Sequence, residues 1–356
     1  MNQQLIFTDT PGAELDRIVD AMGRPQTVVV ADVNTARLVV PALRRQSRTL
    51  SDAPVLTILA GDAHKDINGL QYVWHGLEEL GATRRTLIVN VGGGVVTDLG
   101  GLAAATFKRG LPMVNVPTTL LAAVDASVGA KTGINFNGYK NLIGAFYEPA
   151  ASLISTCFLG TLPRREFLSG YAEMLKHALL DSNEALSELL RHEPDFYAGG
   201  GDVLLDMLRR SVAVKARIVE QDLHETGLRK ALNLGHTAGH AFESLAMARG
   251  EALPHGYAVA AGCVVALILS HLRLGFPSGA LRLFASYVTR HYGPVAFTCD
   301  DYPALLGFMA QDKKNNAPGR IAFTLLEDVG RPRTDIVIEP DNIKAALDIY
   351  RDLSGI

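Results

Sequence analysis

The sequence predicts a chain of two domains, an α/β N-terminal domain and a mainly α-helical C-terminal domain. In the first half, short runs of β-branched residues alternate with helical patterns, which indicates a mostly parallel, layered α/β sheet. After about residue 160, long amphipathic patterns replace this alternation. A chain of 356 residues is long enough for two domains that each bury a core. We therefore expect domains at residues 1–158 and 159–356, with a ligand-binding cleft between them.

Strands and helices are expected to alternate along the N-terminal domain. The predicted strands are "TVVVADV" from Thr27, "PVLTILA" from Pro54, "RTLIVNV" from Arg85 and "MVNVPTT" from Met113. The predicted helices between them are "TARLVVPALRRQ" from Thr35, "INGLQYVWHGLEELG" from Ile67 and "VVTDLGGLAAATFKRG" from Val95.

Long helices are expected to dominate the C-terminal domain. They are "RREFLSGYAEMLKHALLD" from Arg164, "DVLLDMLRRSVAVKARIVEQD" from Asp202 and "SGALRLFASYVTRHYG" from Ser278. One hairpin, "RIAFTLLEDVGRPRTDIVI" from Arg320, interrupts them near the end. The longest apolar stretch, "AVAAGCVVALILS" from Ala258, is too short to span a bilayer and predicts a buried helix.

Composition favours a soluble globular protein, with 48% apolar residues, 20% charged residues and a net charge of −3. The chain has no surplus of basic residues that would indicate nucleic acid as a partner, and it has no segment that would indicate a membrane. The three cysteines, Cys157, Cys263 and Cys299, are too few and too scattered for a disulfide framework. The N-terminal residues lack the pattern of a signal peptide, so we expect a cytoplasmic protein.

A run of three glycines, Gly92, Gly93 and Gly94, lies where a predicted strand passes into a predicted helix. Backbone amides at such a turn can approach a pyrophosphate without a Cβ in the way, and the helix N-terminus favours negative charge. The run departs from the G-x-G-x-x-G pattern, because Thr97 occupies the third glycine position. A tight structural turn and a dinucleotide site therefore both stay open. Asp98, one turn into the helix, favours the second, because a carboxylate there suits hydroxyl groups or a cation.

The segment "VDASVGAKTGINFNGYKNLIGAFYEP" carries Asp125, Lys131, Lys140 and Asn141 among small and apolar residues. Lysines in a poorly hydrated pocket suit the recognition of phosphate or carboxylate groups. The alternative is an ordinary exposed loop. Arg109, at a predicted helix end, is equally compatible with an anion ligand and with a surface arginine that complements the helix dipole.

His236 and His240 stand four residues apart in "NLGHTAGHAFESL", a spacing that places both imidazoles on one face of a helix. His255 and Glu173, each beside or within another predicted helix, are further candidate metal ligands. One carboxylate with two imidazoles is a common catalytic zinc arrangement. Spacing alone leaves open whether His236 pairs with His240 or with His255.

Taken together and in this order, these segments resemble the 3-dehydroquinate synthases of the sugar-phosphate cyclase superfamily. The matching segments, which cover roughly residues 90 to 320, are "GGGVVTDLGG", "FKRG", "VPTTLLAAVDASVGAKTGIN", "YKNLIGAFYEP", "TLPRREFLSGYAEMLKHAL", "VKARIVEQDLHETGLRKALNLGHTAGHA", "PHGYAVAAG" and "DKKN". The histidine motif with its upstream Gly-Leu-Arg is quite specific. The glycine run alone is shared with metal-dependent polyol dehydrogenases.

The resemblance implies a dehydroquinate synthase-like fold and the conversion of 3-deoxy-D-arabino-heptulosonate 7-phosphate to 3-dehydroquinate and phosphate. It implies catalytic NAD, a divalent metal ion (Zn2+ or Co2+), a place in the shikimate pathway of aromatic amino acid biosynthesis, and a homodimer.

The resemblance also implies roles for individual residues. The implied metal ligands are Glu173, His236 and His255, while His240 faces the substrate phosphate. Further phosphate-side or active-site positions are Lys131, Asn141, Asn233 and Lys313. Lys215 and Arg229 match positions that hold the substrate carboxylate, Lys176 and Asp125 match polar residues around the reacting hydroxyls, and Arg109 matches an arginine that reaches the neighbouring subunit's site. The implied cofactor positions are Asp32, Asn34, Asp62, Lys65, Gly93, Gly94, Asp98, Thr118, Thr119, Lys140, Thr161 and Leu162.

Two residues depart from the family pattern. Asp62 stands where a glutamate is usual, which puts cofactor affinity in doubt, and Tyr257 stands where a glutamate commonly follows the His-Gly pair. The alternatives are a cyclase for another sugar phosphate, a polyol dehydrogenase that releases NADH, and a catalytically silent binding protein. Arg229 and Lys215 favour a carboxylate substrate, which disfavours a cyclase for another sugar phosphate. The phosphate-side cluster would be unexplained in a polyol dehydrogenase, and the intact metal candidates disfavour a catalytically silent protein.

Overall fold

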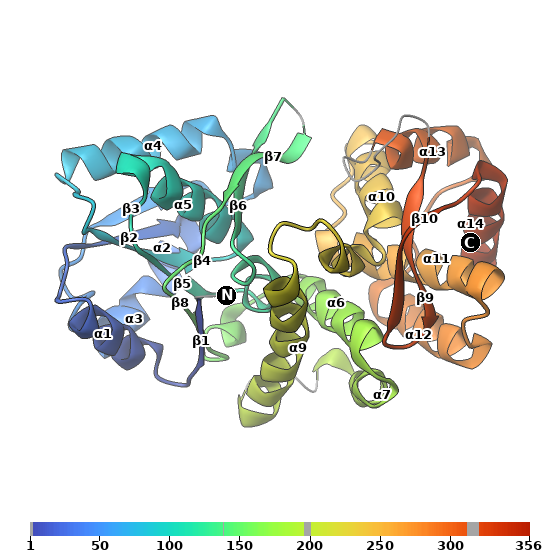
Figure 1. Cartoon of the computed structure of the whole chain (residues 1–356), viewed down its shortest axis with the longest axis horizontal. Helices are drawn as coiled ribbons and strands as arrows, with labels where there is room; N and C mark the ends of the chain where they lie inside the picture. Colours follow the sequence, from blue (N-terminus) through green and yellow to red (C-terminus); the bar gives the residue numbers. More distant parts are fainter. Residues whose placement is uncertain (1–2, 138, 196–200, 312–319) are drawn as a thin grey trace. The chain divides into compact units, whose positions relative to one another are not determined.

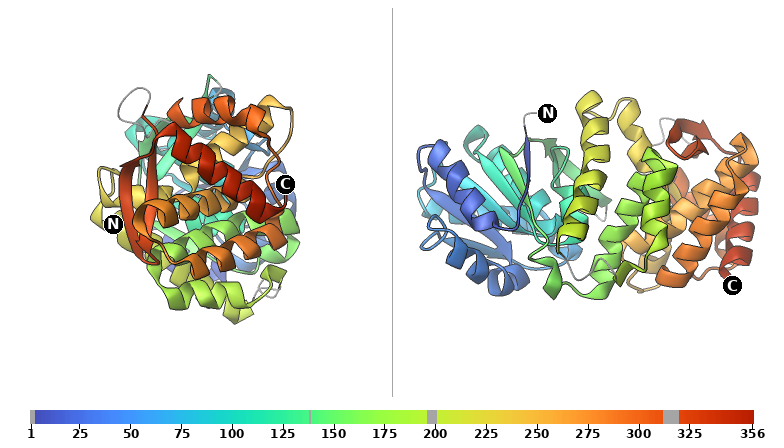
Figure 2. Two further views of the ribbon diagram at one scale, coloured as in Figure 1. Left: turned by 90° about the vertical axis from the view of Figure 1, so that its right-hand side faces the viewer. Right: turned by 90° about the horizontal axis from the view of Figure 1, so that it is seen from below.

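The computed structural model describes residues 3–137, 139–195, 201–311 and 320–356 (Figure 1). The chain divides into two compact units, each of which is described separately. The first unit comprises Met1–Leu162 and Ala198–Ala216, and the second comprises Pro163–Tyr197 and Arg217–Ile356 (Figure 2). The domain boundary expected after residue 158 stays a prediction.

A six-stranded parallel sheet forms the centre of the first unit, with strand order β1-β8-β5-β4-β2-β3. Its strands are β1 (Gln4–Phe7), β2 (Thr27–Asp32), β3 (Val55–Ile58), β4 (Leu87–Gly92), β5 (Met113–Pro117) and β8 (Ala151–Ile154). The four strands predicted from the sequence are β2, β3, β4 and β5, and they are confirmed. The edge strand β1 and its neighbour β8, each four residues long, were not predicted.

Helices cover both faces of this sheet (Figure 1). They are α1 (Pro11–Ala21), α2 (Val33–Leu38), α3 (Val40–Gln46), α4 (Ile67–Glu79) and α5 (Gly94–Thr106). Because side chains alternate along a strand, Val29 of β2 packs in a cluster with Leu15 of α1, while Val28 packs in another cluster with Val73 of α4. The helix predicted from Thr35 is divided into two helices, α2 and α3. Pro41 lies in the first turn of α3, where proline is tolerated because its missing N–H has no helical partner.

A second, antiparallel pair follows β5 in the sequence, formed by β6 (Lys131–Phe136) and β7 (Tyr139–Phe146). The interior residues of β6 are buried, whereas β7 is exposed along almost its whole length. Gly101 of α5 permits the close approach of β6, because a Cβ there would lie 2.6 Å from Thr132 Cγ2. Short helical turns link these elements: η1 (Asp62–His64), η2 (Phe107–Arg109), η3 (Ala122–Ala126) and η4 (Leu159–Thr161).

The second unit is mainly helical, as predicted. Its elements are α6 (Arg164–Asp181), α7 (Asn183–Arg191), η5 (Leu228–Asn233), α10 (His236–Ala248), α11 (His255–Leu274), α12 (Ser278–Tyr292), η6 (Cys299–Asp301), α13 (Tyr302–Gln311), β9 (Ala322–Asp328), β10 (Arg331–Val337) and α14 (Pro340–Ser354). Helix α9 (Gly201–Gln221) contributes residues to both units. The predicted hairpin is confirmed as the antiparallel pair β9 and β10.

The central element of the second unit is α11, which packs against α6, α10, α12, α14 and β9. It is 20 residues long and apolar enough to cross a membrane by length and composition, but 72% of its most apolar window is buried inside the protein. The predicted buried helix is therefore confirmed as part of the core.

Candidate active site

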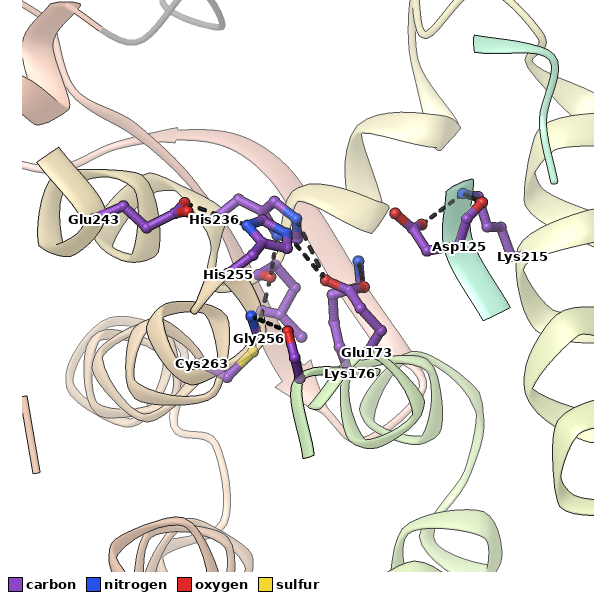
Figure 3. A network of polar contacts seen from close by, with 11 residues as sticks. Asp125, Glu173, Lys176, Lys215, His236, Glu243, His255, Gly256 and Cys263 are labelled. Carbon is purple, nitrogen blue, oxygen red and sulfur yellow. Dashed lines mark hydrogen bonds and ion pairs between the residues drawn. The ribbon is translucent and has the colours of Figure 1, made fainter. Parts of the chain in front are cut away.

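Three helices of the second unit bring together the side chains of Glu173, His236 and His255 (Figure 3). Glu173 lies in the middle of α6, and the two histidines are the first residues of α10 and α11. The Nε2 atoms of His236 and His255 lie 3.6 and 3.7 Å from the same oxygen of Glu173, Oε1. The three ligand atoms lie within 4.8 Å of one another, so one cation could contact all of them.

Glycines allow the helices that carry these ligands to approach closely. Gly235 precedes α10 with a φ of +77°, and a Cβ there would lie 2.4 Å from Cys263 Sγ of α11. A Cβ on Gly262 of α11 would lie 2.0 Å from the carbonyl oxygen of Gly235. Any larger residue at these positions would push α10 away from α11 and separate the two histidines.

A second close contact joins α6 to α11. A Cβ on Gly256 would lie 2.0 Å from the carbonyl oxygen of Ser169, so the two backbones touch directly. The Gly256 N–H also donates a hydrogen bond to Ser169 Oγ at 3.0 Å. Because Ser169 lies one turn before Glu173, and Gly256 follows His255, this contact sets the spacing of these two ligands.

The Nδ1 atom of each histidine has a hydrogen-bond partner, which leaves Nε2 directed at Glu173. Nδ1 of His236 lies 3.1 Å from the carbonyl oxygen of Leu234, and Nδ1 of His255 lies 3.2 Å from Glu243 Oε2. A carbonyl and a carboxylate can only accept, so Nδ1 is the donor in each of these two contacts. Glu243 was not among the residues predicted from the sequence. Its spacing of three residues from His240 on one helix face is the signal that could have identified it.

The electrostatic environment of these residues favours positive charge. Glu173 is completely buried and forms an ion pair with Lys176, three residues later on the same helix. Burial lowers the pKa of His255, but the carboxylates of Glu243 and Glu173 raise it more, to about 10. The two carboxylates therefore make this part of the site favourable for a positively charged group.

His240 lies one helical turn after His236, as its spacing predicted. Its ring centroid is 5.4 Å from that of His236 and 6.1 Å from that of His255. Ligand atoms of His240, Glu243 and His255 form a second group within 4.8 Å. Of the two pairings left open by the sequence, His236 with His255 belongs to the first group, and no such group contains both His236 and His240 among the described residues.

Arg229 and Asn233 both lie in η5, just before α10. Arg229 is only 2% exposed, and its guanidinium donates to the carbonyl oxygen of Leu223. Its own N–H donates to Asp222, whose pKa is held below its usual range by backbone N–H donors. Asn233 Nδ2 donates to Glu225 Oε1 at 2.8 Å.

In the first unit, the glycine run lies at the carboxyl end of β4. Gly93 is the N-cap of α5 and Gly94 its first residue, so free backbone N–H groups lie at this turn. The chain crosses from β3 back to β4 on the other side of β2, which makes the ends of β2 and β4 a topological switch point. Open α/β sheets bind their ligands at such a point.

Several predicted cofactor residues lie at the carboxyl ends of these strands. Asp32 ends β2 and caps α2 by accepting from the N–H groups of Asn34 and Thr35. Thr118 and Thr119 follow β5, and a Cβ on Gly93 would lie 3.1 Å from Thr119 Cγ2. Thr161 and Leu162 lie in and after η4, which follows β8.

Two lysine–aspartate pairs connect the remaining predicted cofactor residues. Lys65, 4% exposed, donates to Asp98 of α5 at 2.7 Å. Burial raises the pKa of Asp98, and Lys65 opposes this rise. Asp62, the departure from the family pattern, lies 3.5 Å from Lys140 Nζ on β7, and both side chains are about half exposed.

Other predicted residues of the first unit lie on or near the β6–β7 pair. Lys131 begins β6 and Asn141 lies in β7 with a φ of +50°. Arg109 is exposed in a left-handed turn after α5, with a φ of +69°. Lys215 donates to Asp125 through both the carbonyl oxygen, at 2.6 Å, and Oδ1, at 2.5 Å (Figure 3). Lys313 lies outside the described residues.

The first unit is a parallel sheet with a glycine turn at its switch point, and the second is a helical unit with a His–His–Glu cluster. Together these features define a class of enzymes built from two units. One solved structure with this fold is 2-epi-5-epi-valiolone synthase from Streptomyces hygroscopicus subsp. jinggangensis, with NAD+ and Zn2+ bound. It matches with a TM-score of 0.87 and 27% identity over 98% of this chain and 97% of that chain.

Comparison with known families identifies the particular group. Residues 55–169 match the 3-dehydroquinate synthase N-terminal family, and residues 170–315 match the 3-dehydroquinate synthase C-terminal family. A 3-dehydroquinate synthase of Parabacteroides distasonis is 44% identical over 99% of both chains. That of Azotobacter vinelandii is 41% identical over 95% of this chain and 93% of its own. The chain belongs to the 3-dehydroquinate synthase family, and it is an enzyme of the shikimate pathway with 3-dehydroquinate synthase activity.

Proposed function

We propose that the chain performs this activity with NAD held by the first unit and one divalent metal ion, zinc or cobalt, held by Glu173, His236 and His255. The observation that carries the proposal is the direction of two Nε2 atoms toward one carboxylate oxygen, at 3.6 and 3.7 Å. Two ligand atoms of a tetrahedral zinc ion lie about 3.3–3.5 Å apart, given bonds of about 2.0–2.1 Å. The donor set and the spacing therefore both fit this metal.

The choice of His255 over His240 as the third ligand follows from the geometry of Glu173. Glu173 Oε1 is the atom that Nε2 of both His236 and His255 faces, so these three residues supply one carboxylate and two imidazoles around a single position. His240, one turn further along α10, then remains for the substrate phosphate. The solved valiolone synthase, which holds NAD+ and Zn2+, supports the use of these two cofactors here.

We assign the NAD site to the carboxyl edge of the parallel sheet. The amides of the Gly93–Gly94 turn would receive the pyrophosphate, because they combine free N–H groups with close backbone access. The Lys65–Asp98 pair, buried beside this turn, would orient a ribose or nicotinamide group through a carboxylate that is already held in place. The remaining members are Asp32, Asn34, Asp62, Thr118, Thr119, Lys140, Thr161 and Leu162.

Substrate recognition is assigned to cationic and amide side chains of both units. Arg229 and Lys215 would bind the substrate carboxylate, since both are buried and carry charge that can be shared with an anion. The phosphate would be bound by Lys131, Asn141, Asn233, His240 and Lys313. Asp125 and Lys176 would contact the reacting hydroxyls.

When bound, the metal ion supplies a Lewis acid for a substrate hydroxyl and the ketone derived from it. NAD supplies a hydride acceptor that is regenerated in each turnover. The protein's own residues orient the substrate for reaction and stabilise its anionic groups. The phosphate-side residues are mainly hydrogen-bond donors, which fits a reaction in which the substrate's own phosphate takes the proton.

We also propose that the enzyme is a cytoplasmic homodimer. Four apolar side chains of β7, those of Tyr139, Leu142, Ile143 and Phe146, are between 41% and 60% exposed. Exposed apolar side chains gathered on one strand are expected where another protein surface covers them. Arg109, exposed on a left-handed turn, is free to extend from the surface of its own unit.

Phosphate release, measured together with absorbance at the NADH wavelength, tests the proposal. With the heptulosonate phosphate, NAD and zinc, the enzyme is expected to release phosphate and form dehydroquinate without lasting NADH. Steady accumulation of NADH without phosphate would contradict it and indicate a dehydrogenase. No phosphate release from this substrate, together with turnover of a sugar phosphate without a carboxylate, would indicate another cyclase.

A further inference from the structure

The two histidines of the proposed metal centre are oriented by different kinds of partner. Nδ1 of His236 faces the backbone carbonyl of Leu234, two residues before it in the chain. Nδ1 of His255 instead faces a side chain, the carboxylate of Glu243, at 3.2 Å (Figure 3). The orientation of His255 therefore depends on a residue from another helix.

The position of Glu243 is rigidly determined. It lies on α10, seven residues after His236, so that the helix directs it to the same side two turns later. Its side chain is only 8% exposed, compared with 30% for that of His255. Gly239, between these two residues of α10, packs directly on α11, because a Cβ there would lie 3.0 Å from the carbonyl oxygen of Ala258.

A carboxylate in this position can do two things for a metal-ligating imidazole. As an acceptor, it keeps the proton on Nδ1 and leaves the lone pair of Nε2 for the metal. As an anion, it makes the imidazole a stronger donor. A backbone carbonyl, the partner of His236, does the first with no net charge.

We infer that Glu243 is a positioning residue of the metal centre, whose carboxylate accepts the Nδ1–H of His255 and directs Nε2 toward the ion. The inference rests on the proposed metal site at Glu173, His236 and His255. In this role Glu243 acts through His255.

Metal binding to the purified apoenzyme, measured by competition with a chromogenic chelator, tests this role without reference to turnover. In Glu243→Ala, the dissociation constant for Zn2+ is expected to rise about 10- to 100-fold, which is the usual effect of removing such a partner. Glu243→Gln keeps the acceptor oxygen without the charge, so its dissociation constant should lie between those of Glu243→Ala and the unchanged enzyme. This second variant also provides an answer if Glu243→Ala does not fold.

The absorption spectrum of the Co2+-loaded enzyme separates positioning from a general loss of stability. A change in the orientation of His255 is expected to shift or weaken the visible cobalt bands in both Glu243 variants. Glu251→Gln, an exposed glutamate just beyond the same helix, serves as the control and should leave affinity and spectrum unchanged.

Each outcome separates this inference from the metal site on which it rests. If His255→Ala loses the metal while both Glu243 variants keep the original affinity and spectrum, the role of Glu243 is refuted and the metal site stands. If His255→Ala retains stoichiometric zinc, the proposed site itself is wrong. Binding of two ions per chain, with one lost in Glu243→Ala, would make Glu243 a ligand of a second centre with His240 and overturn the inference.

Discussion

The metal cluster of the second unit and the glycine turn of the first are assembled from the chain in different ways. Glu173, His236 and His255 lie on three helices, and they meet only because glycines let these helices touch. Gly93, Gly94 and Asp98 instead follow a single strand and lie within the first turns of one helix. The first site depends on tertiary packing, whereas the second depends on local geometry that the sheet supports. Mutations should therefore affect stability and ligand binding together in the first site and separately in the second.

The largest effect is expected from His255→Ala. Loss of one of three ligands should abolish stoichiometric zinc and lower turnover by about 10³-fold, because metal catalysis contributes several kcal/mol. Zinc content by mass spectrometry, together with phosphate release, would measure this. The circular dichroism spectrum should be unchanged, and His75→Ala, which replaces an exposed histidine of α4, should keep both metal and activity. Retained zinc in His255→Ala would reassign the ligand role to His240.

Gly256→Ala and Gly94→Ala form a matched pair that tests the comparison directly. The first should destabilise the protein by about 1–3 kcal/mol, since the new Cβ meets the Ser169 backbone at 2.0 Å, and should weaken zinc binding as well. The second meets only Ala126 Cβ at 3.6 Å, so the free energy of unfolding should stay within about 0.5 kcal/mol.

NAD affinity completes this test. Gly94→Ala should weaken NAD binding by about tenfold, or about 1.4 kcal/mol, because the methyl group lies at the proposed pyrophosphate turn. Urea unfolding and NAD titration by calorimetry would measure the two quantities. Equal losses of stability in both variants would remove the distinction between a packing-dependent and a local site.

Arg229→Ala should weaken substrate binding by about 1.5–3 kcal/mol, because a charged partner of the substrate carboxylate is lost. The effect should appear mainly as a raised KM in steady-state phosphate release. Arg333→Ala, which removes an exposed arginine paired with Glu327, should change neither constant. An unchanged KM in Arg229→Ala would mean that this arginine does not bind the carboxylate.

The smallest effect is expected from Asp62→Glu, which restores the residue usual in the family. Asp62 and Lys140 are both about half exposed, and exposed pairs contribute about 0.2–1 kcal/mol. NAD binding should therefore tighten by no more than about fivefold in a calorimetric titration. Asp52→Glu, another exposed position, should have no effect on NAD affinity. Weaker binding by Asp62→Glu would show that the shorter side chain suits this site.

Local patterns predicted much of the fold, and the strands of the first unit show why. The continuous apolar runs of β2 and β4 are buried on both faces, so their sequences are unambiguous. The segment that forms β6 and β7 is rich in small residues and glycines, and its sequence predicts no strand. Its pairing depends on contacts with α5, including the one at Gly101, that no short window of sequence contains.

The candidate site was likewise predictable where its geometry lies within a single helix. The i,i+4 spacing correctly predicted that His236 and His240 share a helix face, because that relation lies within one helix. Residue spacing could not choose between His240 and His255, because that choice depends on how α10 crosses α11. Spacing places Glu243 on the helix face of His240, but its contact with His255 depends on the same crossing. The family resemblance supplied the ligand set that residue spacing left open.

The ion pair within α6 has a consequence for the order in which the protein is made. Glu173 leaves the ribosome well before His236 and His255, so it must be tolerated in a nascent chain that still lacks them. Lys176, on the next turn of the same helix, gives the carboxylate a counter-charge as soon as that helix forms. An unpaired buried carboxylate would oppose docking of the helix onto its neighbours. Helix α6 therefore already carries a counter-charge for Glu173 when α11 is made with His255 and packs against it.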